Sequence, residues 1–485
     1  MRLTRPDALR PPIGWPAWRQ RLPGLGVPSL WAWGVAAFSV PVGFAILWIG
    51  PRPVLAGAAA LLFLAATIVT WPLSGLVLLI GAAGINRFEV SVGGLSFYPE
   101  YVALGLVSIL LIFDVLRGRS VWRWPPATWL FAAWLVIGLA ASLLHAPNTG
   151  NSLVLWFKLV LMLATYVVTV NLVRGRGQTA VSVQLLAGGA VAAFGLLALA
   201  LWTVSHVNLG VHLKPEGTIA AMGTQWESNV FGSYVAALVV LAGVIVVAPL
   251  ARRLRLSAGL ALLVGIPALA ASLTRAAWLG AVVALGMGIV AWAVRRPRLA
   301  LRITIGLVLL ALPLAAVLLL SDVRTALPTV AMVDGSTLFD RLLSLASLEQ
   351  DGNVWVRLQI YRHVLQVWQE HPWIGWGIGA YGQAYLYPNQ NLSAWIPNLF
   401  LHVLYDSGLF GLVFLIAGLG VALWRGVRAW LNLAGAGRFL AGGLLLAVIA
   451  LLVAFQATEA SWLAYFWVFL GLLEGVAGDT PHPLR

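Results

Sequence analysis

Arg275 stands in the sequence SLTRAAWLG, between two apolar stretches that are each long enough to cross a membrane. An ionisable residue at the mouth of two membrane spans is by default a functional candidate. Its guanidinium can form two parallel hydrogen bonds to a phosphate, so the chemistry it offers is the binding of a phosphate or diphosphate. The alternative is an arginine that extends along the spans only to contact lipid headgroups.

Further arginines occur in the polar segment 321–398, and we expect Arg341 and Arg357 to bind the same anionic ligand, such as a pyrophosphate. Arg362 is expected on a solvated face. Arg357 lies near the edge of an amphipathic helix predicted over residues 353–370, which could lie on the bilayer or cover a cavity. The apolar residues that recur at helical spacing there are Val354, Leu358, Tyr361, Leu365 and Trp368.

Asn398, His402 and Asp406 are spaced one helical turn apart where another apolar stretch begins, so a helix places them on one face. A neutral imidazole at His402 can take a proton from a hydroxyl group, with Asn398 to orient that group. Asp406 would then orient His402 or pair with an arginine. A histidine that simply hydrogen-bonds between helices explains the pattern equally well.

Glu227 and Asn229 lie at the start of an earlier apolar stretch, where we expect them to hydrogen-bond a ligand, although helix capping would also explain Asn229. The histidines of segment 204–229 lack a metal-ligand pattern such as His-Glu-x-x-His, and the acidic residues form no Asp-rich cluster typical of a magnesium-diphosphate site. We therefore predict no metal and no cofactor. The stretch GWGIGAYG contains GxGxxG but lacks the preceding strand that a dinucleotide site requires.

The elements that must position these residues are membrane-spanning helices. The 485 residues are 61% hydrophobic and 9% charged, with a mean hydropathy of +0.92, whereas soluble domains are roughly 25% charged. Unpaired backbone groups are too costly in hydrocarbon for any lipid-exposed alternative to helix. We predict an all-α polytopic integral membrane protein with about 12–14 transmembrane helices. The candidate spans are 29–50, 53–70, 73–86, 100–116, 127–144, 153–172, 181–203, 230–250, 257–273, 276–294, 303–320, 399–424, 439–456 and 461–476.

Arginine clusters between the spans predict the orientation. An N-terminus on the inside places every cluster in the cytoplasm, as the positive-inside rule requires. The net charge of +14 therefore reflects topology and contact with anionic membrane lipids, and we predict no nucleic-acid partner. We expect a multi-pass protein of the plasma (inner) membrane with both termini cytoplasmic. The clusters lie at residues 2–21, 117–123, 174–176, 252–255, 295–302 and 425–438.

This topology divides the chain into six parts. The outer side is dominated by the long loop, expected to carry amphipathic helices, where function should be sought. The Arg- and Pro-rich first part lacks the pattern of a cleavable signal peptide, and the lack of cysteine excludes disulfides. The expected parts are a cytoplasmic tail at 1–28, N-terminal helices at 29–220, core helices at 221–320, the extracytoplasmic loop at 321–398, C-terminal helices at 399–476 and a tail at 477–485.

Four segments stand in order around that loop: TQWESNVFGSYVAAL (224–238), SLTRAAWLG (272–280), VRLQIYRHVLQVWQEHPWIGWGIGAYG (356–382) and PNLFLHVLYDSGLFGL (397–412). Together they resemble the O-antigen ligase and polymerase superfamily of Wzy/WaaL-type proteins. The resemblance extends over roughly residues 220–425. It covers the earlier spans only as a general pattern.

The resemblance implies a metal-independent, inverting membrane glycosyltransferase with a GT-C-like fold. Such enzymes move a glycan from undecaprenyl diphosphate to an acceptor on the outer side of the plasma membrane. The acceptor is a saccharide or is lipid-linked, such as the lipid A core of lipopolysaccharide or a growing repeat-unit chain. The family's diphosphate-binding arginines match Arg275 and Arg357.

One departure from the family concerns the base. Where the family commonly has His-Asn, this chain has Pro397 and Asn398, and proline cannot accept a proton. His402 acting from a shifted position, Glu227, a different acceptor or an inactive protein are the alternatives.

Two further function classes compete with a transferase: a transporter or flippase of lipid-linked saccharides, and a non-catalytic family member. A transporter built from inverted repeats should show charges near the midplane in both halves. Here Lys158 is the main charge within the first half, and the outer polar features concentrate in the second. This asymmetry favours an enzyme that acts on one side. The sequence predicts no particular oligomeric state.

Overall fold

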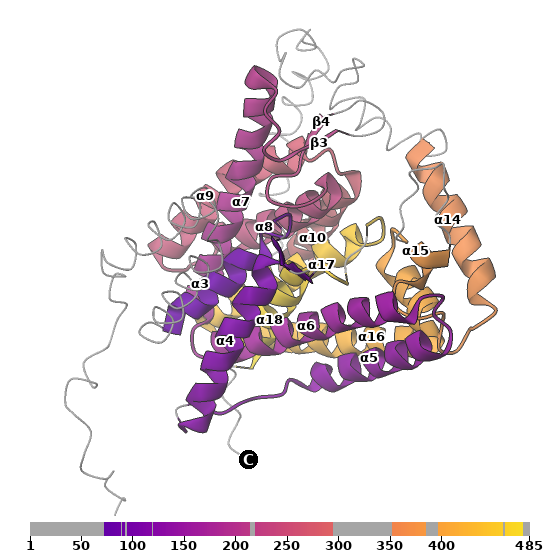
Figure 1. Ribbon diagram of the computed structural model, residues 1–485. Helices are drawn as coiled ribbons and strands as arrows, with labels where there is room; N and C mark the ends of the chain where they lie inside the picture. The colour runs from indigo at the N-terminus through magenta and orange to yellow at the C-terminus, as the bar shows by residue number, and fades with distance from the viewer. Residues whose placement is uncertain are drawn as a thin grey trace, which may run out of the picture. The chain divides into compact units, whose positions relative to one another are not determined.

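The computed structural model describes residues 72–88, 90–92, 95–118, 120–213, 219–293, 352–384, 396–458 and 461–478. The chain divides into a unit at 1–70 and a unit at 71–485, and the described residues all belong to the second unit (Figure 1). The predicted spans 29–50, 53–70 and 303–320 lie outside the described residues. So does Arg341.

The described residues are mostly helical, as expected for an all-α polytopic membrane protein. Eight of the described helices are long and apolar enough to cross a membrane, and α3, α10 and α18 are shorter apolar helices. The helices are α3 (Pro72–Ala83), α4 (Pro99–Leu116), α5 (Pro126–Leu144), α6 (Thr149–Val173), α7 (Gly177–Ser205), α8 (Ser228–Val247), α9 (Arg252–Ala271), α10 (Arg275–Ala293), α14 (Gly352–Trp368), α15 (Ala380–Ala384), α16 (Leu399–Asn432), α17 (Gly435–Ala454) and α18 (Ala464–Ala477).

Each predicted span that lies within the described residues coincides with one of these helices. The largest differences in bounds are at α16, which continues to Asn432 beyond the expected 424, and at α9, which begins at Arg252 before the expected 257. Helices end where caps or backbone breaks occur, whereas the sequence estimate followed where the apolar run ends.

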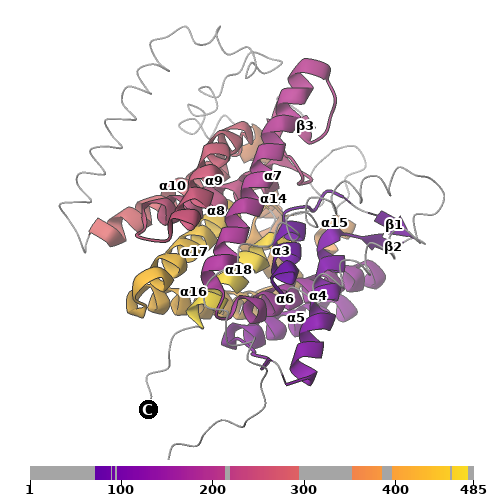
Figure 2. The ribbon, with the colours of Figure 1, turned by 90° about the vertical axis from the view of Figure 1, so that its left-hand side faces the viewer.

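Small residues allow the helices to pack closely. The helix α8 is the most enclosed of the eight candidate spans, with 78% of its apolar window buried, and it contacts α9, α10 and α17. The helix α18 packs on α6, where Gly471 and Gly475 face Thr169 and Val173. Figure 2 shows α7, α8, α9, α10 and α17 along one side of the described unit. Close approach at small residues is typical of helices packed inside a bilayer.

Two short antiparallel hairpins occur in segments predicted only as polar connections. Strand β1 (Val90–Val92) pairs with β2 (Leu95–Phe97), and β3 (Val211–Leu213) pairs with β4 (Ile219–Ala221). Three-residue strands are too short for an alternating apolar pattern to reveal them. The second hairpin is the one that bears on the candidate site, because it leads directly into α8.

The helix α16 is broken at Gly408, whose backbone is non-helical (φ 62°, ψ −167°). The segment 372–379 fills this break. Trp376 N and Gly377 N donate to the carbonyls of Tyr405 and Asp406 (both 2.9 Å), and Leu409 N and Phe410 N donate to the carbonyls of residues 372 and 373 (2.9 and 3.1 Å). The glycine-rich stretch GWGIGAYG therefore packs against a broken helix, and it continues into the short helix α15.

The amphipathic helix predicted over 353–370 is present as α14, and its apolar side chains occupy two faces, of which one is buried in the protein. Leu358 and Leu365 are 47% and 41% exposed. The buried side chains are instead Ile360, Val364 and Val367, which pack against α15 and α16. Apolar residues occur on both faces of this helix, so periodicity alone could not identify the face that is buried.

Candidate active site

The starts of α8 and α10 bring three of the predicted site residues together. Asn229 Nδ2 donates to Glu227 Oε1 (2.9 Å), and Thr274 Oγ1 donates to Asn229 Oδ1 (3.4 Å) and to the carbonyl of Ser228 (3.0 Å). Arg275, the first residue of α10, follows Thr274 directly. A carboxylate and an amide therefore lie together where two helices begin, and Arg275 is the next residue after the threonine that joins them.

The turn between α9 and α10 is held in an unusual conformation. Leu273 has φ of 53°, in the left-handed region that costs a non-glycine residue about 1–2 kcal/mol. Its side chain is buried against Ala220 of β4, and the neighbouring Ser272 and Thr274 side chains are hydrogen-bonded within the turn. Backbone strain of this kind tends to occur at functional sites, where the surroundings maintain it.

His212 determines how α8 begins. Its Nδ1 accepts a hydrogen bond from the backbone N–H of Ser228 (3.3 Å) and lies 3.1 Å from the Ser228 hydroxyl. The first turn of a helix has N–H groups without helical partners, and His212 on strand β3 satisfies one of them. Glu227 is the N-cap residue, but its side chain makes no capping hydrogen bond. Capping therefore does not account for Asn229, and the Glu227 carboxylate is held by Asn229 instead.

A second group forms where α14 meets the start of α16. The Tyr361 hydroxyl donates to the carbonyls of Pro397 (2.8 Å) and Gln456 (3.0 Å). Burial raises the pKa of Tyr361, and the Arg357 guanidinium, one turn earlier, opposes this increase. Arg357 is thus close enough for its charge to act on the Tyr361 hydroxyl, which bonds to the carbonyl of Pro397.

Asn398 has a structural function in this group. Its side-chain oxygen accepts from the backbone N–H groups of Phe400 and Leu401 (both 3.0 Å) and so caps α16, and its Nδ2 donates to the carbonyl of Gln456 (3.1 Å). Capping of this kind stabilises a helix by about 1 kcal/mol. If Asn398 also binds substrate, as predicted, its side-chain amide must do so while making these three contacts.

His402 and Asp406 form a third group, enclosed within the protein. His402 Nε2 lies 3.3 Å from Asp406 Oδ2, which also accepts from Gly379 N (3.1 Å). The two residues are only 2% and 4% exposed. Of the two partners predicted for Asp406, the structure shows His402, and the pair joins α16 to the glycine-rich segment beside the helix break.

The connection between α17 and α18 contacts the group at Tyr361, and the first turn of α18 contacts α8. Gln456 bonds to Tyr361 and Asn398, while the Tyr465 hydroxyl lies 2.6 Å from the Ser233 hydroxyl and donates to the carbonyl of Val230 on α8 (3.2 Å). The starts of α8, α16 and α18 and the end of α17 therefore lie at the same end of the bundle.

Several residues that support these groups were not predicted from the sequence. Thr274 directly precedes Arg275, so its position next to a predicted site residue was a signal in the sequence. For Tyr361, the sequence indicated only an apolar position, and for His212 only an isolated histidine. Gln456 lies far along the chain and has no local signal at all. Their contacts depend on tertiary structure, which residue spacing within one helix does not reveal.

Comparison with known proteins identifies the class. Residues 260–416, about a third of the chain, match the Wzy_C family model, described as O-Antigen ligase. No curated protein matches the chain. The chain is therefore a multi-pass helical membrane protein, and the match over residues 260–416 supports an O-antigen ligase/polymerase-type membrane enzyme.

The match confirms the predicted resemblance to the O-antigen ligase and polymerase superfamily. The matched segment includes Arg275, Arg357, Asn398, His402 and Asp406. It ends within α16 and begins within α9, so Glu227 and Asn229 lie before it.

Proposed function

We propose that this protein transfers a glycan from undecaprenyl diphosphate to a saccharide or lipid-linked acceptor on the outer side of the plasma membrane, without a metal and with inversion at the anomeric carbon. The observation that carries the proposal is the grouping of Glu227, Asn229 and the Thr274–Arg275 turn within a chain that matches the O-antigen ligase family over residues 260–416. The polyprenyl chain would occupy lipid beside the helices while its diphosphate stays at the interface.

Arg275 and Arg357 would stabilise the diphosphate leaving group. Charge develops on that group as the glycosidic bond breaks, and fixed guanidinium groups stabilise such charge without a metal. Arg275 is the first residue of α10, so the positive end of the helix dipole adds to its charge.

Accessibility separates the two candidate bases. A general base must come within hydrogen-bond distance of the acceptor hydroxyl. Glu227 is only half-buried and lies in the Asn229–Thr274 group, whereas His402 is 2% exposed. We therefore assign proton acceptance to Glu227, and we assign to the His402–Asp406 pair the positioning of α16 against the segment that fills its break.

The helix α14 supplies the cover that such a reaction requires. Its buried face packs on α15 and α16, and Tyr361 ties it to the starts of the spanning helices. A covered site keeps water from hydrolysing the lipid-linked glycan. The exposed apolar residues Trp355, Leu358 and Leu365 would rest against the headgroup region of the bilayer.

Removal of either arginine tests the proposal. We expect Arg275→Ala and Arg357→Ala each to reduce transfer at least about a hundredfold, as is typical when a group that stabilises the transition state is lost. The assay is release of free carrier diphosphate from a polyprenyl-diphosphate glycan by the purified protein, with and without EDTA.

Arg362→Ala is the matched control, because Arg362 is exposed on the same helix as Arg357. It should retain activity. Full transfer by the Arg275 or Arg357 variant, or equal loss in the control, would contradict these roles. Inhibition by EDTA would contradict metal independence.

The departure at Pro397 gives a second test, which separates an enzyme from a non-catalytic protein. Pro397 lies beside Tyr361 and precedes Asn398, so a histidine there would stand beside the tyrosine on whose hydroxyl the Arg357 charge acts. We expect Pro397→His to increase release of carrier diphosphate. A transporter or a non-catalytic protein would instead bind or move the lipid-linked glycan without consuming it, in the wild type and in this variant.

A further inference from the structure

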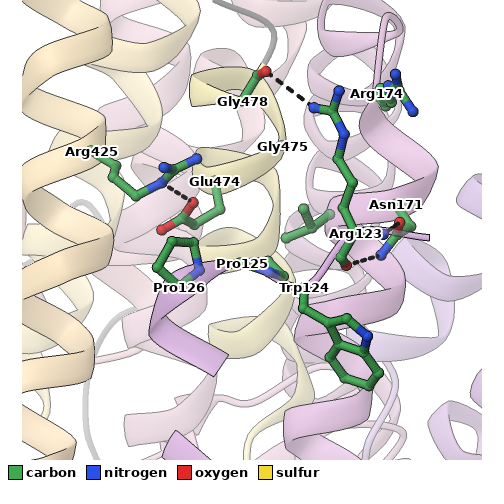
Figure 3. A pocket seen from close by; sticks show the side chains of 11 residues that line it. Arg123, Trp124, Pro125, Pro126, Asn171, Arg174, Arg425, Glu474, Gly475 and Gly478 are labelled. Carbon is green, nitrogen blue, oxygen red and sulfur yellow. Dashed lines mark hydrogen bonds and ion pairs between the residues drawn. The ribbon is translucent and has the colours of Figure 1, made fainter. Parts of the chain in front are cut away.

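A hollow lined by arginines lies where α6 and α18 end (Figure 3). The space without protein atoms there is about 450 Å³, open solvent included, between the start of α5 and the ends of α6 and α18. Arg123 and Arg174 lie on one side of it, and Arg425 and Glu474 lie on the other. The arginine distribution predicts that this end is cytoplasmic.

Among the described residues, the arginines around the hollow outnumber the acidic side chains. Arg425 Nε pairs with Glu474 Oε2 (2.6 Å), which neutralises one arginine. Arg123 Nη1 donates a long hydrogen bond to the carbonyl of Gly478 (3.4 Å), and Arg174 has no acidic partner among the described residues. Two guanidinium charges therefore face the same space without a counter-ion from the described residues, an arrangement suited to a phosphate.

The position of Arg123 is fixed by the backbone. Its N–H donates to Asn171 Oδ1 (2.9 Å), and its carbonyl accepts from Asn171 Nδ2 (3.0 Å). Asn171 lies on α6, three residues before Arg174, so these bonds hold the two arginines beside each other. The bonds hold the backbone of Arg123 beside α6, while Arg123 and Arg174 are both exposed.

Glu474 indicates a second property of the ligand. Its side chain is fully buried, and Oε1 has no hydrogen-bond partner among the described residues. A buried polar atom without a partner is costly, and its presence calls for an explanation. A hydroxyl group on a ligand in the hollow would supply the missing donor.

Aromatic residues at the same end identify the source of the ligand. Trp122, Trp124 and Trp129 form a group with ring centroids 5.7 Å apart in each adjacent pair, and Trp124 and Trp129 are more than half exposed. Tryptophan is enriched at the level of lipid headgroups. Trp124 also lines the hollow, so the hollow opens at the depth where headgroups lie.

We infer that this hollow binds the headgroup of an anionic phospholipid of the cytoplasmic leaflet, with a phosphodiester held by Arg123 and Arg174 and a free headgroup hydroxyl donating to Glu474. Phosphatidylglycerol has both features. Phosphatidylcholine has the same phosphodiester but carries no net charge and no hydroxyl donor. This site is separate from the proposed transfer reaction and does not depend on it.

Native mass spectrometry of the full chain in detergent can test the inference by counting bound lipids during titration with phosphatidylglycerol or phosphatidylcholine. We expect the wild type to bind phosphatidylglycerol about tenfold more tightly, equivalent to about 1.4 kcal/mol. The variant Arg123→Gln/Arg174→Gln should lose this preference. The control is Arg252→Gln/Arg253→Gln, which removes the same charge from exposed residues at the start of α9 and should keep it.

Three results would overturn the inference. Equal binding of both lipids by the wild type would do so without any variant, so a misfolded variant could not conceal the failure. Equal loss of the preference in the control would indicate general surface charge. Displacement of phosphatidylglycerol by inorganic phosphate at the same concentration would indicate a site for a free anion.

Discussion

The contacts of each residue at the candidate site decide how that residue can be interpreted. The sequence singled out Glu227, Asn229 and Arg275 as separate candidates, and the structure joins them through Thr274. The same contacts change how His402 is interpreted: its imidazole is paired with Asp406 inside the protein, so its spacing from Asn398 on one helix face did not establish access to a substrate.

The assignment of the base leads to a prediction at Glu227. Glu227→Gln keeps the hydrogen bond with Asn229 but removes the capacity to accept a proton, so turnover should fall about 10²–10⁴-fold while binding of the donor is retained. His402→Gln should reduce activity much less. Initial rates at saturating donor measure both. A severe loss in the His402 variant alone would restore histidine as the base.

His371 predicts acid sensitivity of the segment that fills the α16 break. Its ring stacks on His145 at 3.8 Å, and His145 Nδ1 lies 2.8 Å from the carbonyl of Gly375. Burial lowers the pKa of His371, and the charge of His145 lowers it further, while Glu370 opposes both. The folded state therefore favours neutral His371, and stability should fall as pH drops below the usual histidine value of about 6.5.

Thermal unfolding between about pH 7.5 and about pH 5.5 measures this loss. His371→Gln has no proton to gain, so its melting temperature should depend less on pH over the same range. An identical pH dependence in the variant and the wild type would contradict the prediction.

At the scale of the element, the break in α16 is the feature that the sequence did not predict. A helix broken inside the protein leaves backbone groups that need partners. Here the segment 372–379 provides them on both sides of Gly408. The sequence showed glycines in both places but gave no sign that they meet. Helical periodicity describes contacts within an element and not between elements.

Gly408→Ala should destabilise the protein, because φ of 62° disfavours a side chain and a Cβ atom would meet the backbone at Trp373. The left-handed conformation alone accounts for about 1–3 kcal/mol. Gly420→Ala in the same helix is the control: nothing lies within 4 Å of its Cβ, so it should be neutral or slightly stabilising. Melting temperatures in detergent compare the two. Equal temperatures would contradict the prediction.

At the scale of the whole molecule, the sequence predicted much of the architecture and less of the site. Hydropathy blocks such as 127–144 became helices because the bilayer leaves the backbone no other structure. The buried face of α14, the hairpin that carries His212 and the ties through Gln456 were not predicted. These features depend on which helix faces pack against each other. Because apolar residues occur on all faces of these helices, the sequence does not identify the packed faces.

The predicted orientation can be tested on the native background, because the chain contains no cysteine. Val207→Cys, at an exposed position after α7, should react with a membrane-impermeant maleimide added outside intact cells. Ala251→Cys, exposed before α9, should react only after permeabilisation. The positive-inside rule gives this expectation. The reverse labelling pattern would invert the topology and move the arginine-lined hollow to the outer side.

The packing of Gly375 against Gly408 has a consequence for how this sequence can vary. A Cβ atom on Gly375 would meet the backbone of residues 405–408, and one on Gly408 would meet the backbone of residues 373–374. A side chain at either position is therefore excluded by the same close contact between the two backbones. Once either glycine is replaced and the segment has moved away, replacement of the other should cost little more, so a saturation library should reveal strong epistasis between two sites that are distant along the chain.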